Sequence, residues 1–271
     1  MKKKRAFLKW AGGKYPLIEE IRRHLPAGER LVEPFVGAGS VFLNTDYDEY
    51  LLADINADLV GLYNIVKDET DRFIGDARQM FCPELNVSEE YYRIREAFNL
   101  CDDRYQRALY FLYLNRHCYN GLCRYNAKGS STSPSGAIKT LLPAGGAGVF
   151  ARKAERAVFV CEHYQQTMLR AQPGAVVYCD PPYAPLSATA NFTAYHVNGF
   201  GFAEQMRLAE LAGELAQRQV PVLISNHETP LTREWYAQAD ALHVVKVRRT
   251  ISRKTDGRSK VNELLALYGK R

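Results

Sequence analysis

The sequence predicts an α/β fold in which a parallel sheet is interrupted by an inserted helical segment. Two observations predict this fold. Strand-like apolar runs alternate with helical patterns near both ends of the chain, and three successive helical patterns break that alternation in the middle. A chain of 271 residues suffices for one large domain or two smaller ones. We therefore expect a sheet-containing domain built from residues 1–67 and 155–271, with residues 68–154 inserted into it.

The first elements open the sheet. Arg30–Phe35 reads as a short strand closed by a turn with two glycines, and Tyr50–Ala53 reads as a second buried strand. Ser40 is placed to cap a short helix that runs through Asn44. Apolar residues at helical spacing predict a helix over Ala57–Lys67. This order of strand, turn, helix, strand and helix is typical of a parallel α/β sheet.

The middle of the chain carries the insertion. Three helices are predicted there, at Asp68–Phe81, Ser88–Leu100 and Arg104–Arg116. Asn120-Gly121 is a dipeptide typical of hairpin turns. Lys128–Gly148 is rich in Gly, Ser, Pro and Ala, and it predicts a flexible loop.

After the insertion the alternation resumes. Strands are predicted at Ala157–Cys161, Ala175–Cys179 and Val220–Ser225, and an amphipathic helix at Phe202–Gln217. His243–Arg248 and Val261–Tyr268 are expected to pair antiparallel across the basic loop between them.

Positive charge is concentrated in three segments, although the net charge is only +6. Arg104–Ala154 holds eight Lys or Arg and no acid, His243–Lys260 holds seven against Asp256 alone, and Lys2–Arg5 adds four. These segments total +18 and leave −12 for the rest of the chain. An acidic body with basic segments is what a polyanion-binding protein needs. The alternative interpretation is a set of solvated surface charges.

The cysteines and the apolar runs suggest a cytoplasmic protein. The six cysteines are scattered, without the paired spacing of a zinc site or a disulfide framework, so reduced thiols and no metal are expected. No apolar run is long enough to span a membrane, and the basic N-terminus lacks the apolar stretch of a signal peptide.

The first chemical motif is the sequence EPFVGAGS at the end of the first predicted strand, Glu33–Ser40. Its glycines allow the backbone to approach a ligand closely. Asp54 ends the next strand, where nucleoside-binding α/β folds place an acid against ribose hydroxyls. No phosphate-binding signature follows, which favours a nucleoside without pyrophosphate. Alternatively, the motif is a tight turn and Asp54 a helix cap.

The second motif is Asp180-Pro181-Pro182-Tyr183, directly after an apolar strand. The prolines stiffen the turn, so Asp180 lies at the carboxyl edge of the sheet, where α/β proteins bind ligands. A carboxylate, a nearby backbone carbonyl and the ring of Tyr183 could grip a planar exocyclic amine and direct its lone pair. The alternative is a structural turn stiffened by proline.

These motifs together resemble those of Dam-type DNA adenine-N6 methyltransferases, in the α group of amino methyltransferases. The resemblance rests on the order of a KWAGGK segment, the FVGAG turn, a long insertion and DPPY, and it covers nearly the whole chain apart from Gly129–Val149. Further matching strings are LADIN, FLYLNR, YNGLCRYN and VPVLISNH. The resemblance implies a Rossmann-like methyltransferase sheet with an inserted helical and β-hairpin target-recognition domain.

The resemblance also implies the reaction. A methyl group passes from S-adenosyl-L-methionine to adenine N6 in double-stranded GATC, by base flipping and direct in-line attack, and S-adenosylhomocysteine is the product. No covalent enzyme intermediate and no metal are expected. The family further implies a bacterial cytoplasmic, nucleoid-associated enzyme that acts as a monomer. DNA replication, mismatch repair and transcription stay open as the processes that use the methyl mark.

The resemblance assigns site residues position by position. Four match the catalytic motif: Asp180, Pro181, Pro182 and Tyr183. Four match cofactor contacts: Trp10, Lys14, Asp54 and Asp180. Seven match the surrounding cofactor pocket: Ala11, Gly12, Glu33, Phe35, Gly37, Gly39 and Ser40.

Ten residues match DNA-contacting positions. Tyr119 and Asn120 match the wedge beside the flipped adenine, Arg124 the reader of a guanine, and Lys9, Leu122 and Pro134 other base contacts. Arg95, Arg116, Asn126 and Lys139 match phosphate contacts. Arginine is the best bidentate partner of guanine, and an aromatic ring can insert between base pairs. Without the resemblance, a phosphate clamp, a packed ring and an ordinary turn asparagine remain open for Arg124, Tyr119 and Asn120.

One segment departs from the family pattern. Where relatives carry a stretch resembling FNVPFGRYK, this chain has STSPSGAIK at Ser131–Lys139, with Ala137 and Ile138 in place of an arginine and a tyrosine. Either this loop compensates differently or it grips DNA more weakly.

Two other functions stay open from the residues alone. One is a methyltransferase acting on another planar amine or amide, such as an RNA base or a protein glutamine. The other is a catalytically weakened homologue that only binds DNA.

Overall fold

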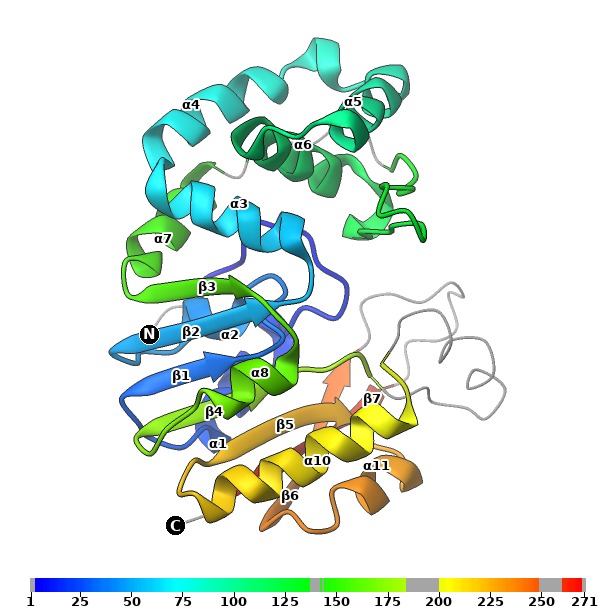
Figure 1. The fold of residues 1–271 in the computed structure, drawn as a ribbon. Coiled ribbons are helices and arrows are strands. Elements are labelled where there is room, and N and C mark those ends of the chain that lie inside the picture. The colour runs from blue at the N-terminus through cyan, green and yellow to red at the C-terminus, as the bar shows by residue number, and fades with distance from the viewer. Residues whose placement is uncertain (1–2, 137–141, 143, 184–199, 249–259, 270–271) are drawn as a thin grey trace. The chain divides into compact units, whose positions relative to one another are not determined.

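The protein contains a seven-stranded sheet in the order β3-β2-β1-β4-β5-β7-β6. The structure is a computed structural model that describes residues 3–136, 142, 144–183, 200–248 and 260–269 (Figure 1). It divides into two compact units. The first consists of Met1–Tyr15, Gly37–Asn44 and Asp54–Cys161, and the second of Pro16–Val36, Thr45–Ala53 and Glu162–Arg271.

The second unit holds most of the sheet. Its strands are β1 (Arg30–Glu33), β2 (Glu49–Asp54), β4 (Ala175–Cys179), β5 (Val222–His227), β6 (Ala241–Arg248) and β7 (Lys260–Tyr268). β1 pairs parallel with β2 and β4, and β4 pairs parallel with β5. β7 is antiparallel to both β5 and β6. Parallel strands end at one edge of the sheet, so the residues after β1, β4 and β5 share that edge.

Helices cover this sheet. They are η1 (Tyr15–Leu17), α1 (Ile18–His24), α8 (Tyr164–Leu169), α10 (Phe202–Gln217) and α11 (Pro230–Trp235). In Figure 1, α8 and α10 lie in front of the sheet and α1 lies behind it. Leu208, Leu211 and Leu215 form the buried stripe of α10, and the central strand β4 is buried throughout. Strands covered on both faces read as continuous apolar runs, which is why the sequence predicted them well.

The first unit is mainly helical. It contains α2 (Ser40–Asn44), α3 (Ala57–Asp68), α4 (Thr70–Met80), η2 (Pro83–Leu85), α5 (Ser88–Leu100), α6 (Arg104–His117), η3 (Tyr119–Gly121), α7 (Ala144–Ala154) and the strand β3 (Ala157–Cys161). α6 packs against α3 and α5. Part of the core is a cluster of rings in which Phe150 of α7 stacks on Tyr63 of α3 at 4.6 Å and meets Phe7 edge-on at 5.2 Å.

A short hairpin follows α6, and we call residues Leu122–Pro134 the recognition hairpin. Its arms are joined by the Thr132 N–H, which donates to the Arg124 carbonyl at 2.8 Å, and by the Asn126 N–H, which donates to the Ser130 carbonyl at 3.0 Å. Tyr125 and Ser131 form an antiparallel bridge. The chain therefore reverses at the tip between Asn126 and Ser130.

The predicted α/β fold and the predicted strands and helices are confirmed, and the structure adds the helices α1, α8 and α11, which the sequence did not predict. Three predicted features differ from the structure. The hairpin reverses at the tip just described and not at Asn120-Gly121, which instead form a left-handed turn with φ of 54° and 70°. α7 begins at Ala144, inside the segment predicted as a loop over Lys128–Gly148. Ser40 is the first residue of α2 and not its cap.

Two features concern membranes and thiols. Among the residues that the structure describes, no helix is both long and apolar enough to cross a membrane. All six cysteines carry free thiols, as the scattered spacing predicts.

Candidate active site and nucleic-acid interface

The carboxylate of Asp180 lies directly after β4, at the carboxyl edge of the parallel strands. The Ser225 hydroxyl, on the neighbouring strand β5, lies within hydrogen-bond distance of Asp180 Oδ1 (3.2 Å) and of the Cys179 carbonyl (3.4 Å). A carboxylate that accepts a hydrogen bond from a buried hydroxyl is held in one orientation. The sheet therefore fixes the direction of Asp180.

The rest of the Asp180–Tyr183 turn is held from two further elements. The Tyr183 hydroxyl donates to Glu263 Oε2 of β7 at 2.7 Å, and Gln205 Nε2 of α10 donates to the Pro182 carbonyl at 2.8 Å. Burial, together with the charges of Asp180 and Glu263, raises the pKa of Tyr183, so its hydroxyl keeps the proton. Among the described residues no donor reaches the Pro181 carbonyl. This carbonyl lies next in sequence to the carboxylate.

The end of β1 contributes Glu33 and Phe35 to the same unit. Glu33 is only 2 % exposed, and Phe35 stacks on Tyr164 of α8 with ring centroids 5.3 Å apart. Burial raises the pKa of the Cys179 thiol well above its ordinary value, and the charges of Asp180 and Glu33 add to that shift. The ends of β1 and β4 therefore each carry a carboxyl group, Glu33 and Asp180.

In the first unit, Asp54 holds the glycine turn. Its Oδ2 accepts from the Gly37 N–H at 3.1 Å and its Oδ1 from the Asn56 N–H at 3.0 Å. Burial raises the pKa of Asp54, although these N–H groups act in the opposite direction. Gly37 has a φ of 47°, and a Cβ there would lie 2.9 Å from Trp10 Nε1. Only glycine allows the turn to pass this close beneath the Trp10 ring.

The remaining predicted cofactor residues of this unit lie in two short segments. Ala11 and Gly12 are exposed, whereas Lys14 is 6 % exposed and its Nζ donates to the Gly12 carbonyl at 2.6 Å. Gly39 is buried with a φ of 69°, and its carbonyl accepts from the Leu43 N–H at 2.9 Å.

The predicted DNA-contacting residues form two groups by exposure. The exposed group is Tyr119, Asn120, Arg124, Asn126 and Pro134. Asn126 Oδ1 accepts from the N–H groups of Lys128 (2.9 Å) and Ser130 (3.0 Å), which shapes the hairpin tip. The Arg124 side chain makes no hydrogen bond or ion pair with the described residues and is available for a ligand. Lys139, with Ala137 and Ile138, lies outside the described residues.

The second group is partly buried and consists of Lys9, Arg95, Arg116 and Leu122. Lys9 Nζ donates to the Arg116 carbonyl at 2.6 Å, and the Arg116 guanidinium donates to the Phe7 carbonyl at 3.4 Å. Burial, and to a smaller extent the Arg116 charge, lowers the pKa of Lys9. Arg95 donates to the Ser133 carbonyl at 3.1 Å. These cations donate hydrogen bonds to backbone carbonyls of the recognition hairpin and of the segments beside it.

Several supporting residues were not found from the sequence. Ser225 carries a local signal, because it opens a polar triplet at the end of an apolar strand. Glu263 and Gln205 carry none, since they approach the Asp180–Tyr183 turn from distant parts of the chain. Asp58 and Tyr125, which are joined by a hydrogen bond, are also separated by most of the insertion.

The parallel sheet and the Asp180–Tyr183 turn define a methyltransferase of the amino-group class, and comparison with known proteins agrees. The sequence model of the D12 class N6 adenine-specific DNA methyltransferase family matches residues 10–251, and the chain belongs to this family. It is 66 % identical to the DNA adenine methylase of Serratia marcescens over 99 % of this chain and 100 % of that protein. Identity is 62 % to the DNA adenine methylase of Escherichia coli strain K12, with 99 % and 96 % covered. It is 56 % to that of Vibrio cholerae, with 99 % and 97 % covered.

The chain is therefore an adenine-specific DNA methyltransferase, with DNA as its substrate and a requirement for a methyl donor. Membership confirms the resemblance, the methyltransferase fold and the enzyme class predicted from the sequence. The roles of individual residues stay predictions.

Proposed function

We propose that this enzyme transfers a methyl group from S-adenosyl-L-methionine to adenine N6 within double-stranded GATC, after the adenine has flipped out of the duplex. The observation that carries the proposal is the Asp180–Tyr183 turn, held by Ser225, Gln205 and Glu263 with two acceptors beside a tyrosine ring. An exocyclic amine has two hydrogens to donate, and its nitrogen is shielded by pairing inside a duplex.

Positioning and electrostatics supply the catalysis. Asp180 and the Pro181 region accept the two amino hydrogens, while the Tyr183 ring stacks on the base. This grip directs the nitrogen lone pair away from the protein acceptors. As nitrogen forms its new bond to the methyl group, the bond from that methyl to sulfur breaks and nitrogen becomes positively charged, a charge that the fixed Asp180 carboxylate stabilises. One amino proton then passes by way of Asp180 to solvent, which leaves neutral N6-methyladenine. No nucleophilic side chain is required.

The residues of each motif suit a different part of the methyl donor. Each oxygen of the Asp54 carboxylate accepts one backbone N–H and keeps further acceptor capacity for a ribose hydroxyl. The carboxyl groups of Glu33 and Asp180 are suited to a positively charged sulfonium. When bound, S-adenosyl-L-methionine supplies the electrophilic methyl group and leaves as S-adenosylhomocysteine. Trp10, Lys14 and the glycine turn complete the proposed contacts.

The recognition hairpin and the neighbouring turn at Tyr119 and Asn120 provide the DNA contacts in this proposal. Arg124 is exposed and suited to the O6 and N7 acceptors of a guanine. Tyr119, 53 % exposed, and Asn120 are placed at a turn from which they can fill the space that the adenine leaves. The three relatives are bacterial, and we propose the nucleoid in the bacterial cytoplasm as the place of action and a monomer as the acting form.

The test measures transfer of a tritiated methyl group from S-adenosyl-L-methionine to defined substrates. We expect label in a GATC duplex, little in a matched GTAC duplex, and none in RNA or protein. With 2-aminopurine at the adenine position, binding should raise the fluorescence, because the base leaves the stack. Equal labelling of both duplexes would refute the GATC assignment, and labelling of RNA would favour a different substrate.

Asp180→Ala tests the mechanism, with the exposed Asp102→Ala as its matched control. Asp180→Ala should abolish methyl transfer while the thermal unfolding midpoint and DNA binding persist, because DNA is gripped elsewhere. Asp102→Ala should retain transfer. Methyl transfer by Asp180→Ala at the parental rate would remove Asp180 from the catalytic group.

A further inference from the structure

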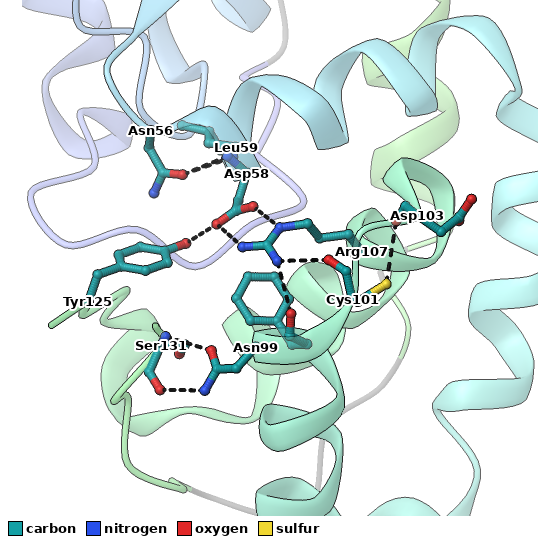
Figure 2. Close-up of polar contacts among 10 residues, drawn as sticks. Asn56, Asp58, Leu59, Asn99, Cys101, Asp103, Arg107, Tyr125 and Ser131 are labelled. Carbon is teal, nitrogen blue, oxygen red and sulfur yellow. Dashed lines mark hydrogen bonds and ion pairs between the residues drawn. The ribbon is translucent and has the colours of Figure 1, made fainter. Parts of the chain in front are cut away.

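A partly buried polar cluster connects the recognition hairpin to the helices of the same unit (Figure 2). Asp58, the second residue of α3, pairs with Arg107 of α6 through Oδ1 to Nε (2.5 Å) and Oδ2 to Nη2 (3.3 Å). The Tyr125 hydroxyl, from the first arm of the hairpin, donates to Asp58 Oδ2 at 2.7 Å. The Asp58 side chain is 11 % exposed and that of Arg107 29 %.

Arg107 limits the rotation of the Asp58 carboxylate, because Arg107 is itself held by several groups. Its Nη1 donates to the carbonyls of Phe98 (2.9 Å) and Cys101 (3.1 Å), and its guanidinium lies 4.1 Å from the centre of the Phe98 ring. A guanidinium whose donors are satisfied presents a fixed fork to a carboxylate. Asp58 is therefore a rigid acceptor for Tyr125.

The second arm of the hairpin is anchored independently. Asn99 of α5 exchanges two hydrogen bonds with the backbone of Ser131, at 2.7 and 3.2 Å (Figure 2). The Tyr91 hydroxyl and Arg95 both donate to the Ser133 carbonyl, at 2.9 and 3.1 Å. The hairpin is thus tied to the helices on both arms. On the arm that carries Arg124, the Tyr125 hydroxyl makes the shorter contact, beside a weaker one from Asn115 Nδ2 of α6 to Cys123 Sγ at 3.8 Å.

The alternation of side chains along an extended arm links the Tyr125 hydrogen bond to the direction of the Arg124 side chain. Successive side chains point to opposite faces, so a Tyr125 that points inward leaves Arg124 and Asn126 pointing outward, and both are exposed. Burial, with the nearby Asp58 charge, raises the pKa of Tyr125, so its hydroxyl stays protonated as a donor. If the hydroxyl is lost, the arm can roll and the direction of Arg124 is no longer fixed.

We propose that Tyr125 and Asp58 are positioning residues for base reading: their hydrogen bond sets the direction from which Arg124 approaches the DNA. This inference rests on the proposed role of the hairpin. It predicts an effect on base discrimination, whereas the KM for S-adenosyl-L-methionine is left unchanged.

Tyr125→Phe is the test, because it removes one hydroxyl and keeps the ring and the Asp58–Arg107 pair. Tyr105→Phe is the matched control, since the Tyr105 hydroxyl donates to Asp76 Oδ2, also at 2.7 Å, from α6 to α4. The first measurement is hydrogen exchange of the Asn126 and Thr132 amides, which needs no substrate. We expect faster exchange in Tyr125→Phe only, and equal rates in both variants would overturn the proposal.

The second measurement is the ratio of kcat/KM for GATC over a duplex with one guanine replaced. A hydrogen bond to a charged group leads us to expect about a tenfold loss of this ratio in Tyr125→Phe and none in Tyr105→Phe. Adding Arg124→Ala to Tyr125→Phe should give no loss beyond that of Arg124→Ala alone, because Tyr125 acts through Arg124.

An unchanged ratio, or additive losses, would make Tyr125 merely structural and overturn the proposal. Failure of the proposed function gives a different result, namely no transfer to GATC by the parent protein. In that case the amide exchange still decides whether Tyr125 orders the arm.

Discussion

Gly37 shows how a single residue supports the proposed cofactor site. Its N–H donates to Asp54, its carbonyl accepts from the Tyr63 hydroxyl at 2.5 Å, and its open face lies against Trp10. A residue with a side chain at position 37 would have to adopt a left-handed backbone conformation, and its Cβ would clash with the Trp10 ring. The backbone of residue 37 thus contacts Asp54 and Tyr63, whereas the positive φ and the closeness of Trp10 are what require glycine. Two of these neighbours, Asp54 and Trp10, are predicted cofactor contacts.

Gly37→Ala should therefore lower the free energy of unfolding by about 1–3 kcal/mol and raise the KM for S-adenosyl-L-methionine, because Trp10 must move. The matched control is Gly75→Ala in the middle of α4, where a Cβ meets nothing within 4 Å. Loss of a helical glycine should stabilise the fold by about 0.5–1 kcal/mol and leave the KM unchanged. Urea unfolding and methyl-transfer kinetics measure both quantities. An unchanged KM in Gly37→Ala would separate the turn from the cofactor.

Among single residues, the sequence predicted those that belong to a recognisable local motif. Asp180, Gly37 and Asp54 were found because a turn or a strand end marks them. Glu263 and Tyr125 could not be found in this way, since their partners, Tyr183 and Asp58, lie 80 and 67 residues away. Such contacts depend on the three-dimensional fold and leave no local pattern.

Helices and strands with a clear periodicity of apolar residues were predicted from the sequence, and those without it were missed. The bounds of α5 agree with the prediction, Ser88–Leu100, because its apolar residues repeat at helical spacing. α7 was missed because its first residues, Ala144–Gly148, are small and glycine-rich, a composition typical of loops. Packing of Phe150 against Phe7 and Tyr63 compensates for this weak propensity. Tertiary contacts thus decide elements whose local preference is poor.

The contact between α1 and β6 leads to a pH-dependent prediction. His24 at the end of α1 stacks on His243 of β6, with ring centroids 3.9 Å apart. Burial, and then the charge of His243, lowers the pKa of His24 from its ordinary value of 6.5, although Glu20 acts in the opposite direction and Arg23 in the same one. The unfolded chain therefore takes up this proton at a higher pH than the folded chain.

It follows that the His24 contribution to stability is lost as the pH falls through about 6.5 towards the lowered folded value. Urea unfolding between roughly pH 7.5 and 5.5 should show a shallower decline of the free energy of unfolding in His24→Gln than in the parent protein. His243→Gln should give part of the same effect, because it removes the neighbouring charge. The same decline in His24→Gln and the parent would show that the pKa of His24 is not lowered as described.

For the molecule as a whole, the location of charge matters more than its sum. A net charge of +6 conceals basic segments in an otherwise acidic chain. The structure distinguishes two kinds of cation within that total. Some are consumed by internal contacts, as Lys9 and Arg107 are, and others, such as Arg124 and Lys128, are exposed on the recognition hairpin. Only the second kind can displace counterions from DNA.

Two double variants with the same change in net charge test whether DNA affinity depends on the cations of the recognition hairpin or on the net charge of the molecule. Arg124→Gln with Lys128→Gln should make the slope of log affinity against log salt less negative by about 2 for a duplex measured between roughly 50 and 200 mM salt. Arg207→Gln with Arg233→Gln removes two cations that are each paired with a glutamate, on α10 and α11. This pair should leave the slope unchanged, because those cations do not face DNA in the proposal. Equal slopes in the two variants would mean that affinity follows the net charge of the molecule, and the recognition hairpin would then have no special part in holding DNA.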